Sequence, residues 1–357
     1  MSKKICLITT SLANGGAQRF CASLSKVLDR LGHEVHIVTT KDFVDYEFSG
    51  SLFNLEQTLE GSNSTLKKIK ILKKYFRLHD FDYIIDNRTR SQFLKEFFLY
   101  RYIFKAKKII SIVHSHYLKN YLPKSVFLAK LIYNNNYKIV AVSNAILNTV
   151  INKYKFKNCV QIYNPIDLSR IQRNVNEAIE VKENYILFYG RIEESVKNLT
   201  LLLNAYKKSV LWQNNIKLKI VGDGKDTFLL KEKISEFQLE NDVILTSYIK
   251  NPFPFVKKAL FTTLTSRHEG FPMVLIESLA CETPVISVDC KSGPKEIIKH
   301  ENNGLLVENH NPEALAKAFD SFVLDKELYH NCKKNAKSSI NKFSIENISK
   351  EWEKLLV

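Results

Sequence analysis

The sequence predicts an α/β protein made of two doubly wound parallel-sheet domains. Short β-rich runs alternate with amphipathic helical segments along the whole chain, which is the pattern of a parallel sheet with crossover helices. The 357 residues are enough for two domains that each bury a core of their own. A polar segment at 177–184 separates two such α/β series, and there are no further internal repeats.

Composition excludes several classes of protein. Hydrophobic residues make up 45% of the chain, as in globular proteins, and no run of about 18 apolar residues predicts a membrane span. The apolar stretch after Met1 to Lys4 is too short for a signal peptide, so we expect a cytosolic protein. The cysteines lack metal-ligand spacing and indicate core residues in a reducing compartment: Cys6, Cys21, Cys159, Cys281, Cys290 and Cys332.

The net charge of +16 is concentrated in the first half of the chain. Residues 1–165 carry 26 Lys and Arg against 11 Asp and Glu, whereas the remainder carries 27 against 26. No acidic residue occurs from Phe97 to Ile166. This stretch is either a generic basic surface or a surface for anionic lipid or a lipid-diphosphate acceptor.

The segment from Ser64 to Asp80 predicts a basic amphipathic helix. Its apolar stripe is predicted at Leu66, Ile69, Leu72 (or Lys73) and Phe76, with basic side chains around it (Lys67, Lys68, Lys70, Lys74 and Arg77). Such a helix can lie in a lipid interface. Packing of the stripe on the protein's own sheet is slightly favoured, and both can hold if only the basic flank meets lipid.

The chain opens with a predicted strand at Ile5 to Thr10, a helix ending near Leu31 and a strand at Glu34 to Thr39. Gly15 and Gly16 lie where the helix begins and allow a phosphate to approach the backbone closely. The GxGxxG pattern is missing, and no acidic residue ends the second strand. A dinucleotide-binding fingerprint is therefore not supported.

Two histidines follow the next pair of predicted strands, at Tyr83 to Asp86 and Lys108 to Val113. His114 and His116 lie at a carboxyl strand end, where parallel sheets place ligand-binding residues. A two-histidine metal site lacks a nearby carboxylate, so we expect no metal here. A purely structural histidine that caps the strand end is the other interpretation. Further strands are predicted at 138–142 and 160–163.

The second half begins with a predicted strand at Tyr185 to Tyr189, followed by Gly190 and Arg191 and then by Lys197 and Asn198 at a helix start. Two cations in these places can neutralise a leaving diphosphate without a metal. Ordinary surface residues are the alternative. Two more strands, at 217–221 and 243–246, end in turns that contain Gly222 and, in the second case, Tyr248 and Ile249.

The most informative stretch is Ser266 to Ile298, SRHEGFPMVLIESLACETPVISVDCKSGPKEII, which predicts a turn, a helix and a buried strand. Pro272 suits the first helical position. Glu269 precedes the helix and Glu277 lies inside it, while the helix start at Gly270 to Met273 offers free N–H groups for a phosphate. A nucleotide sugar fits this arrangement. An ordinary βαβ unit with solvated glutamates is the alternative.

This stretch resembles the donor-site motif of the retaining family 4 glycosyltransferases, and its sequence is especially similar to that of the lipopolysaccharide-type hexosyltransferases. The resemblance implies the GT-B fold, in which two Rossmann-like domains face each other across a cleft. Asn164 to Asp167 resembles the family's interdomain crossover, which implies domains at 1–165 and 166–343. The last helix, 344–357, resembles the tail that packs back on the first domain.

The resemblance also implies roles for individual residues. Arg191 and Lys197 would hold the diphosphate, Glu277 the ribose and Glu269 the donor sugar, with His114 contacting that sugar from the first domain. The implied catalytic residues are therefore His114, Glu269, Arg191 and Lys197. The implied donor-binding residues are Gly15, Gly16, Asn198, Gly222, Tyr248, Ile249, Gly270, Phe271, Pro272, Met273 and Glu277.

The implied activity is retaining transfer of a hexose or N-acetylhexosamine from a nucleotide diphosphate sugar, with UDP expected, to a glycan or lipid-linked glycan in bacterial surface polysaccharide synthesis. We expect no metal cofactor and a cytoplasmic protein, with peripheral contact to an anionic plasma membrane left open. The alternatives are another GT-B chemistry, such as UDP-sugar 2-epimerisation or phosphorolysis, and a basic nucleic-acid-binding or membrane-binding module. No motif with interleaved aromatic residues predicts a nucleic-acid partner.

Overall fold

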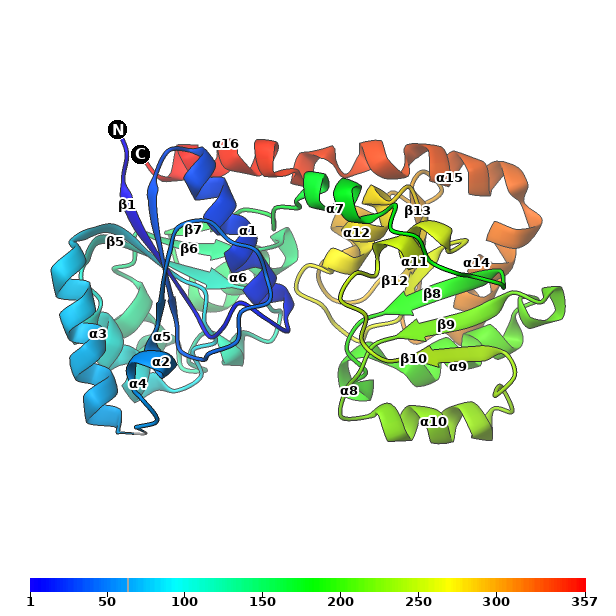
Figure 1. Ribbon diagram of the computed structural model, residues 1–357, viewed down its shortest axis with the longest axis horizontal. Helices are drawn as coiled ribbons and strands as arrows, with labels where there is room; N and C mark the ends of the chain where they lie inside the picture. The colour runs from blue at the N-terminus through cyan, green and yellow to red at the C-terminus, as the bar shows by residue number, and fades with distance from the viewer. Residues whose placement is uncertain (63) are drawn as a thin grey trace. The chain divides into compact units, whose positions relative to one another are not determined.

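The computed structural model describes residues 1–62 and 64–357 and is α/β throughout, as predicted. The chain divides into two compact units. Unit 1 contains Met1–Pro165 together with Ile345–Val357, and unit 2 contains Ile166–Ser344 (Figure 1). Within the described residues, no helix combines the length and the apolar character needed to cross a membrane.

Unit 1 is built on a seven-stranded parallel sheet with the order β3-β2-β1-β4-β5-β6-β7. The strands are β1 (Lys4–Thr9), β2 (Glu34–Thr39), β3 (Ser51–Asn54), β4 (Phe81–Asp86), β5 (Ala106–Val113), β6 (Lys138–Ala141) and β7 (Cys159–Gln161). Ile5 of β1 lies opposite Val35 on one side and Tyr83 on the other. The strand order therefore reverses between β1 and β4, the place where doubly wound sheets bind ligands at their carboxyl ends.

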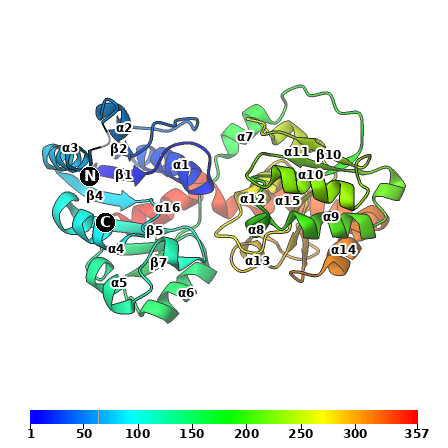
Figure 2. The same ribbon diagram turned by 90° about the horizontal axis from the view of Figure 1, so that it is seen from below.

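The helices of unit 1 form two groups of neighbours, α1 with α16, and α3, η1, α4, α5 and α6 in series. Their bounds are α1 (Gly16–Arg30), α2 (Leu55–Thr58), α3 (Thr65–His79), α4 (Phe93–Phe98), the π-helical turn η1 (Leu99–Ile103), the 3₁₀ turn η2 (Leu118–Asn120), α5 (Val126–Tyr133), α6 (Asn144–Tyr154) and α16 (Ile345–Leu355). Figures 1 and 2 both draw α4 beside α5. Right-handed crossovers account for the two groups, since reversal of the strand order moves the helices to the other face.

The C-terminal helix α16 completes unit 1. Trp352 is fully buried, and α16 packs along α1. The chain end is also held by hydrogen bonds, because the Tyr137 hydroxyl donates to the Leu355 carbonyl at 3.0 Å and the Tyr83 hydroxyl donates to the Val357 carbonyl at 3.0 Å. The apolar face of α1 is thus covered by residues from the far end of the sequence.

Unit 2 repeats the same topology with six parallel strands in the order β10-β9-β8-β11-β12-β13. They are β8 (Tyr185–Tyr189), β9 (Lys217–Val221), β10 (Val243–Thr246), β11 (Thr262–Leu264), β12 (Val285–Val288) and β13 (Gly304–Val307). The order reverses between β8 and β11, where Leu187 lies opposite Thr262.

Unit 2 has an apolar core that includes Leu202, Ile220, Phe261 and Phe319. The bounds of its helices are α7 (Leu168–Asn174), α8 (Glu194–Lys197), α9 (Leu199–Lys208), η3 (Trp212–Asn214), α10 (Thr227–Glu236), α11 (Phe253–Lys258), α12 (Met273–Ala280), α13 (Pro294–Ile297), α14 (Pro312–Leu324), α15 (Lys326–Ser339) and η4 (Asn341–Phe343). Helices α9 and α14 pack against each other over this core.

Helix α3 differs from its prediction at one end. Phe76 is fully buried and contacts the rings of Phe81 and Phe104, so the second half of the predicted stripe does pack on the unit's own core. Leu66, predicted on the same stripe, is 72% exposed. The aromatic contacts of Tyr75, Phe76 and His79 lie in the second half of the helix, whereas residues 64–67 at its start are exposed. Helical periodicity alone gives no sign of where this supporting surface ends.

Candidate functional site

The candidate site of unit 2 is at the reversal of its strand order. The chain that leaves β8 supplies Gly190, Arg191 and α8, and the chain that leaves β11 supplies Thr265 to Glu269. Because β8 and β11 are adjacent and parallel, their carboxyl ends bring these two segments together at one edge of the sheet. Helix α12 then starts three residues after Gly270.

Lys197 and Glu269 meet at this edge although 72 residues separate them in sequence. The Lys197 Nζ lies 2.6 Å from Glu269 Oε1, and the two side chains are only 18% and 13% exposed. The Ser266 hydroxyl donates to the same carboxylate oxygen at 2.7 Å, and the Thr265 hydroxyl donates to the Lys197 carbonyl at 2.8 Å. A partly buried and hydrogen-bonded pair is held in place more firmly than a surface pair. The site thus contains a positioned cation whose partner is a single carboxylate.

Asn198 fixes the backbone beside Lys197. The sequence placed both residues at the start of one helix, but the structure ends the short helix α8 at Lys197 and begins α9 at Leu199. Asn198 joins the two in the left-handed conformation, with φ 52° and ψ 52°, which Asn tolerates better than most residues. The Arg267 guanidinium donates to the Asn198 side-chain oxygen at 2.7 Å and locks this turn.

Helix α12 begins at Met273, so Pro272 is its N-cap residue and not the first helical residue as predicted. Pro272 has an extended ψ of 95°, and the turn before it is held because the Ser292 hydroxyl donates to the Gly270 carbonyl at 2.8 Å. Gly293 is required here: its φ is +102°, and a Cβ would lie 2.3 Å from Pro272 Cδ. A proline cap supplies no side-chain acceptor, so the first N–H groups of α12 lack a side-chain cap.

Glu277 lies one turn into α12 and is only 3% exposed. The Tyr189 hydroxyl, at the end of β8, donates to the Val274 carbonyl at 2.8 Å and lies 3.4 Å from Glu277 Oε2. The end of β8 therefore lies against both the backbone of α12 and this carboxylate. This burial was not expected from the sequence, which gave no information about Tyr189 as a partner.

The other predicted donor-binding residues of unit 2 occupy loops. Arg191 is 61% exposed and pairs with Glu193 at 3.9 Å, and Tyr248 is 59% exposed. Gly222 has a packing reason to be glycine, since its φ is +150° and a Cβ would lie 1.9 Å from the Gly190 carbonyl oxygen. Ile249 is partly buried. Their roles in binding remain predictions.

In unit 1, the predicted glycine pair lies at the start of α1. Gly15 is the N-cap in an extended conformation, its N–H donates to the Tyr46 hydroxyl at 3.3 Å, and Gly16 is the first helical residue. A Cβ built on Gly16 would meet no atom within 4 Å. The start of α1 has neither a side-chain cap nor an acidic residue in its first turn, which leaves it electrostatically suited to an anion.

His114 follows β5 directly. Its Nε2 lies 2.5 Å from the Asn87 side-chain oxygen, and its ring contacts the edge of Phe20 at 4.8 Å between centroids. Burial, with a smaller contribution from the charge of Arg90, lowers the pKa of His114 to about 3. The imidazole is therefore neutral at physiological pH. Among the residues that the structure describes, no group of three or more His, Cys, Asp or Glu could hold a metal ion.

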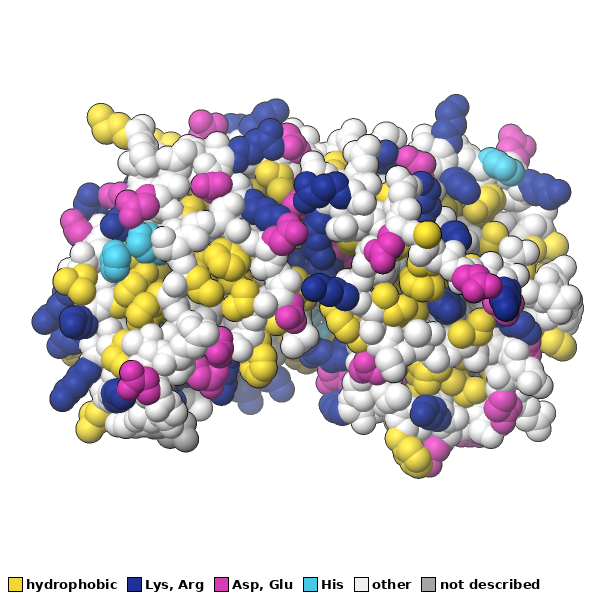
Figure 3. Space-filling model, viewed as in Figure 1, with side chains coloured by type: hydrophobic (Ala, Val, Ile, Leu, Met, Phe, Trp, Pro, Cys, Tyr) yellow, Lys and Arg dark blue, Asp and Glu magenta, His cyan; other side chains and the backbone are white. Residues whose placement is uncertain are grey.

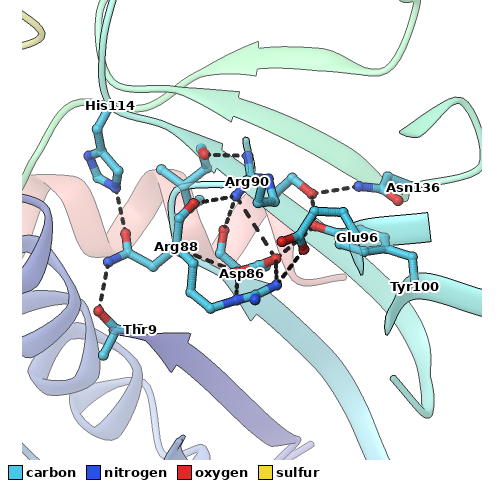
Figure 4. A network of polar contacts seen from close by, with 11 residues as sticks. Thr9, Asp86, Arg88, Arg90, Glu96, Tyr100, His114 and Asn136 are labelled. Atoms are coloured by element: carbon cyan, nitrogen blue, oxygen red, sulfur yellow. Dashed lines mark hydrogen bonds and ion pairs between the residues drawn. The ribbon is translucent and has the colours of Figure 1, made fainter. Parts of the chain in front are cut away.

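Sequence analysis missed a buried ionic network at the carboxyl end of β4 (Figure 4). Asp86 is fully buried and accepts from Arg88 Nε at 2.9 Å and Nη2 at 2.8 Å, and the same Nη2 donates to Glu96 at 2.9 Å. Burial alone would raise the pKa of Asp86, but the charges of Arg88 and Arg90 outweigh it and lower that pKa. The available signal was the alternation Asp86, Arg88, Arg90 directly after an apolar strand.

Arg90 belongs to the same network and is 1% exposed. It donates to three backbone carbonyls, those of Asp86 at 2.9 Å, Arg88 at 3.0 Å and Ile112 at 2.7 Å. Its guanidinium also lies over the rings of Tyr121 and Tyr133, at 5.6 and 5.7 Å from their centroids. The network therefore ties β4 to β5 just below His114.

Comparison with known proteins assigns each half of the chain to a glycosyltransferase family model. Residues 14–170 match the family described as "Glycosyltransferase Family 4", and residues 170–339 match "Glycosyl transferases group 1". The match to the first family covers most of unit 1, and the match to the second covers most of unit 2.

Two curated relatives from Campylobacter jejuni subsp. jejuni serotype O:2 align over nearly the whole chain. The N-acetylgalactosamine-N,N'-diacetylbacillosaminyl-diphospho-undecaprenol 4-alpha-N-acetylgalactosaminyltransferase is 30% identical, over 99% of this chain and 100% of the relative. The GalNAc-alpha-(1->4)-GalNAc-alpha-(1->3)-diNAcBac-PP-undecaprenol alpha-1,4-N-acetyl-D-galactosaminyltransferase is 29% identical, over 99% and 98%.

A solved structure supports the fold. A mutant of S. aureus TarM, crystallised with fondaparinux, alpha-GlcNAc-glycerol and UDP, superposes with a TM-score of 0.80 at 15% identity and covers 99% of both chains. Both units have the Rossmann-like parallel sheets of the GT-B fold. The chain belongs to the family 4 glycosyltransferases.

Proposed function

We propose that this glycosyltransferase moves a hexose or N-acetylhexosamine from a UDP-sugar to a lipid-linked glycan, with retention of anomeric configuration. The observation that carries the proposal is the Lys197–Glu269 pair at the same strand ends as the uncapped start of α12 and the buried Glu277. The two Campylobacter relatives are named for acceptors on diphospho-undecaprenol, and the TarM structure contains UDP. Those names support the choice of donor and acceptor.

The geometry suggests how the leaving diphosphate is stabilised. Lys197 and the first N–H groups of α12 bind it, and the exposed Arg191 adds a second cation from its loop. Once a diphosphate neutralises Lys197, Glu269 loses its ion-pair partner and becomes available to a sugar hydroxyl. Glu277 accepts hydrogen bonds from the ribose.

A retaining reaction at this site needs no nucleophile from the protein. The departing diphosphate oxygen takes the acceptor's proton while the acceptor oxygen bonds to the anomeric carbon from the same face. Two cations and a helix start supply the charge that a divalent metal would otherwise bring. We therefore propose turnover without a metal.

The test is a donor screen that measures UDP release from the purified protein with a synthetic diphosphate-lipid glycan acceptor. We expect release from one UDP-hexose or UDP-N-acetylhexosamine, full activity in EDTA, and an α-linked product from an α-linked donor by NMR. Release from only a non-uridine donor, or activity that EDTA abolishes and manganese restores, would reject the corresponding part of the proposal. Turnover of a UDP-sugar without acceptor would instead favour an epimerase.

We further propose that unit 1 docks on an anionic membrane, where a lipid-linked acceptor would be found. Glu96 is the only carboxylate between Asn87 and Ile166, and it is buried and paired with Arg88. The exposed face of this stretch therefore carries an excess of positive charge, although Asp82, which precedes the stretch, pairs with Lys107 at 2.8 Å.

Exposed apolar side chains accompany this charge. Leu94, Phe98 and Tyr102 follow one another at helical spacing on α4 and η1, and are 79%, 39% and 55% exposed. On the adjacent α5, Phe127 is 75% exposed. Leu66 and Leu78 of α3 are similarly exposed. Figure 3 shows Lys and Arg side chains along the edge of the molecule where Figure 1 draws α3. Apolar side chains among basic ones fit the interface of an anionic bilayer.

Vesicle co-sedimentation tests the docking proposal. Binding should be stronger to phosphatidylglycerol than to phosphatidylcholine vesicles and should weaken with salt, since screening acts over about 8 Å at physiological ionic strength. Charge reversal on α3 (Lys67, Lys68, Lys70, Lys73 and Lys74 to Glu) should abolish the difference. Reversal of five exposed lysines of unit 2 (Lys207, Lys231, Lys250, Lys295 and Lys333) is the matched control. Equal effects of the two sets would show only a dependence on net charge.

A further inference from the structure

The Asn87 side chain connects His114 to the strands at the point where the order of the unit 1 sheet reverses. Asn87 directly follows β4 and is 3% exposed, and its backbone N–H donates to the Ile8 carbonyl at 2.8 Å. Its side-chain nitrogen donates to the Ala17 carbonyl at 2.7 Å and contacts the Thr9 hydroxyl at 3.4 Å. Figure 4 shows this chain of contacts from Thr9 to His114.

These contacts determine which ring nitrogen of His114 carries the proton. The Ala17 carbonyl oxygen can only accept, so the amide nitrogen of Asn87 must face it. The amide oxygen then faces His114 Nε2 at 2.5 Å. Because that oxygen is also only an acceptor, Nε2 must be the donor.

The surroundings of the ring keep it at a single proton. Phe20 and Tyr121 lie at 4.8 and 6.2 Å between ring centroids, and neither carries a charge at neutral pH. Arg90 is the charged group that acts on the ring, and it disfavours a second positive charge. In the part of the chain the structure describes, 1–62 and 64–357, no hydrogen bond is made to Nδ1.

We propose that Asn87 is a positioning residue that holds His114 in its neutral Nε2–H form, so that Nδ1 accepts a hydrogen bond from a hydroxyl of the sugar substrate. His114 then acts as a fixed acceptor and transfers no proton in the reaction. The proposal rests on the proposed function for the identity of the substrate. The tautomer itself is a property of the free protein.

Long-range ¹H–¹⁵N NMR on protein labelled at histidine tests the tautomer directly, with His114→Gln to assign the signal. We expect the pattern of a neutral ring protonated at Nε2, unchanged from pH 5 to pH 8. Addition of the UDP-sugar should shift the Nδ1 resonance, whereas UDP alone should not. An Nδ1–H tautomer or a titration in this range would overturn the proposal.

Asn87→Asp provides the matched perturbation, since it keeps the size of the side chain but places a charge next to Nε2. We expect His114 to begin to titrate in this range, and kcat/KM to fall about tenfold as the ring becomes protonated, which is typical of losing one hydrogen bond. Thr9→Val, which removes the 3.4 Å contact to Asn87 and the 3.2 Å hydrogen bond from the Thr9 hydroxyl to the Ser11 carbonyl, should leave the tautomer and the pH profile unchanged.

If Asn87→Asp does not fold, the spectrum of the wild-type protein still decides the first half of the proposal. An unaltered His114 signal in a folded Asn87→Asp protein would overturn the positioning role. Because these spectra are recorded without substrate, an error in the proposed donor would leave the tautomer result intact. A correct tautomer with no Nδ1 shift for any active donor would overturn only the acceptor role.

Discussion

The two units share one strand order but use charge differently where that order reverses. In unit 1 the charges at the end of β4 are sealed inside: the side chains of Asp86, Arg88 and Glu96 are 0%, 7% and 3% exposed. In unit 2 the pair between Lys197 and Glu269 is 18% and 13% exposed, in loops that follow β8 and β11. The same topological position thus holds a structural network in one unit and an accessible ion pair in the other.

Burial explains what each arrangement can do. A buried charged group is stable only while its ion-pair and hydrogen-bond partners offset the cost of desolvation. The unit 1 network can therefore hold β4 and β5 together but cannot exchange a partner for a ligand. A half-buried pair keeps solvent access and can exchange one anion for another. Topology therefore indicates where to look for a ligand site, and the exposure of the charged groups indicates which unit offers a replaceable partner.

The largest expected effect is on stability and comes from Arg88→Met. Removal of this guanidinium leaves Asp86 and Glu96 buried without their shared partner, which should cost about 3–5 kcal/mol of the free energy of unfolding. Urea denaturation in a Trp212→Phe background measures it, because Trp352 is then the reporter and is buried in unit 1. Lys107→Met, which breaks the exposed pair with Asp82, is the control and should leave the midpoint unchanged. Similar midpoints for the two variants would contradict the structural role.

Lys197→Ala should give the largest effect on activity. Loss of a positioned group that stabilises charge in the transition state costs about 10²–10³-fold in kcat. Steady-state kinetics with the active donor measures this, and Lys225→Ala is a matched control, since Lys225 pairs with Glu193 on an exposed loop of the same unit. A loss of less than tenfold would show that Lys197 serves only to hold Glu269.

Glu277→Ala should act on donor binding. Hydrogen bonds to a charged acceptor contribute about 1.5–3 kcal/mol, so calorimetry should find UDP affinity ten- to a hundredfold weaker. Glu277→Gln preserves the shape and one acceptor oxygen and should lose less. Unchanged affinity in a folded Glu277→Ala protein would place the ribose elsewhere.

The smallest effect concerns pH. The pKa of Asp86 is lowered in the folded state, so its contribution to stability is complete above its unfolded value of about 3.9 and is lost as pH falls further. The difference in unfolding free energy between wild type and Asp86→Asn should therefore shrink in acid. Burial raises the pKa of Glu96, so ionisation of this carboxylate lowers the stability of the folded state, opposite to Asp86. At pH 7, Glu96→Gln should therefore reduce the free energy of unfolding less than Asp86→Asn does. Equal costs at pH 7 would show that the two carboxylates are equivalent.

Strands could be predicted from short runs in which apolar residues recur. The predicted bounds of β2, β8, β9 and β10 agree with the structure because apolar residues recur over each short run and a turn ends it. β3 could not be found in this way: Ser51 and Leu52 are exposed at the sheet edge, and the segment lacks a continuous apolar run. Leu66 shows the complementary error, since a helical period does not reveal how far the supporting core extends.

The sequence predicts the site residues of unit 2 better than the buried network of unit 1. Lys197, Glu269 and Glu277 could be selected because they lie in compact motifs beside strand ends, but the pairing of Lys197 with Glu269 depends on two strands far apart in sequence. Asp86, Arg88 and Arg90 were missed because charged residues after a strand normally face solvent. Nothing in their order reveals that Glu96 and Tyr100 turn back to cover them.

The position of α16 has a consequence for how the protein is made. During translation, the strands and helices of 1–165 leave the ribosome before any of unit 2, yet the face of α1 that α16 covers stays bare until 345–357 emerge. Unit 2 is continuous in sequence and has all its parts before that moment. The half of the protein that is synthesised first is therefore the half that is finished last.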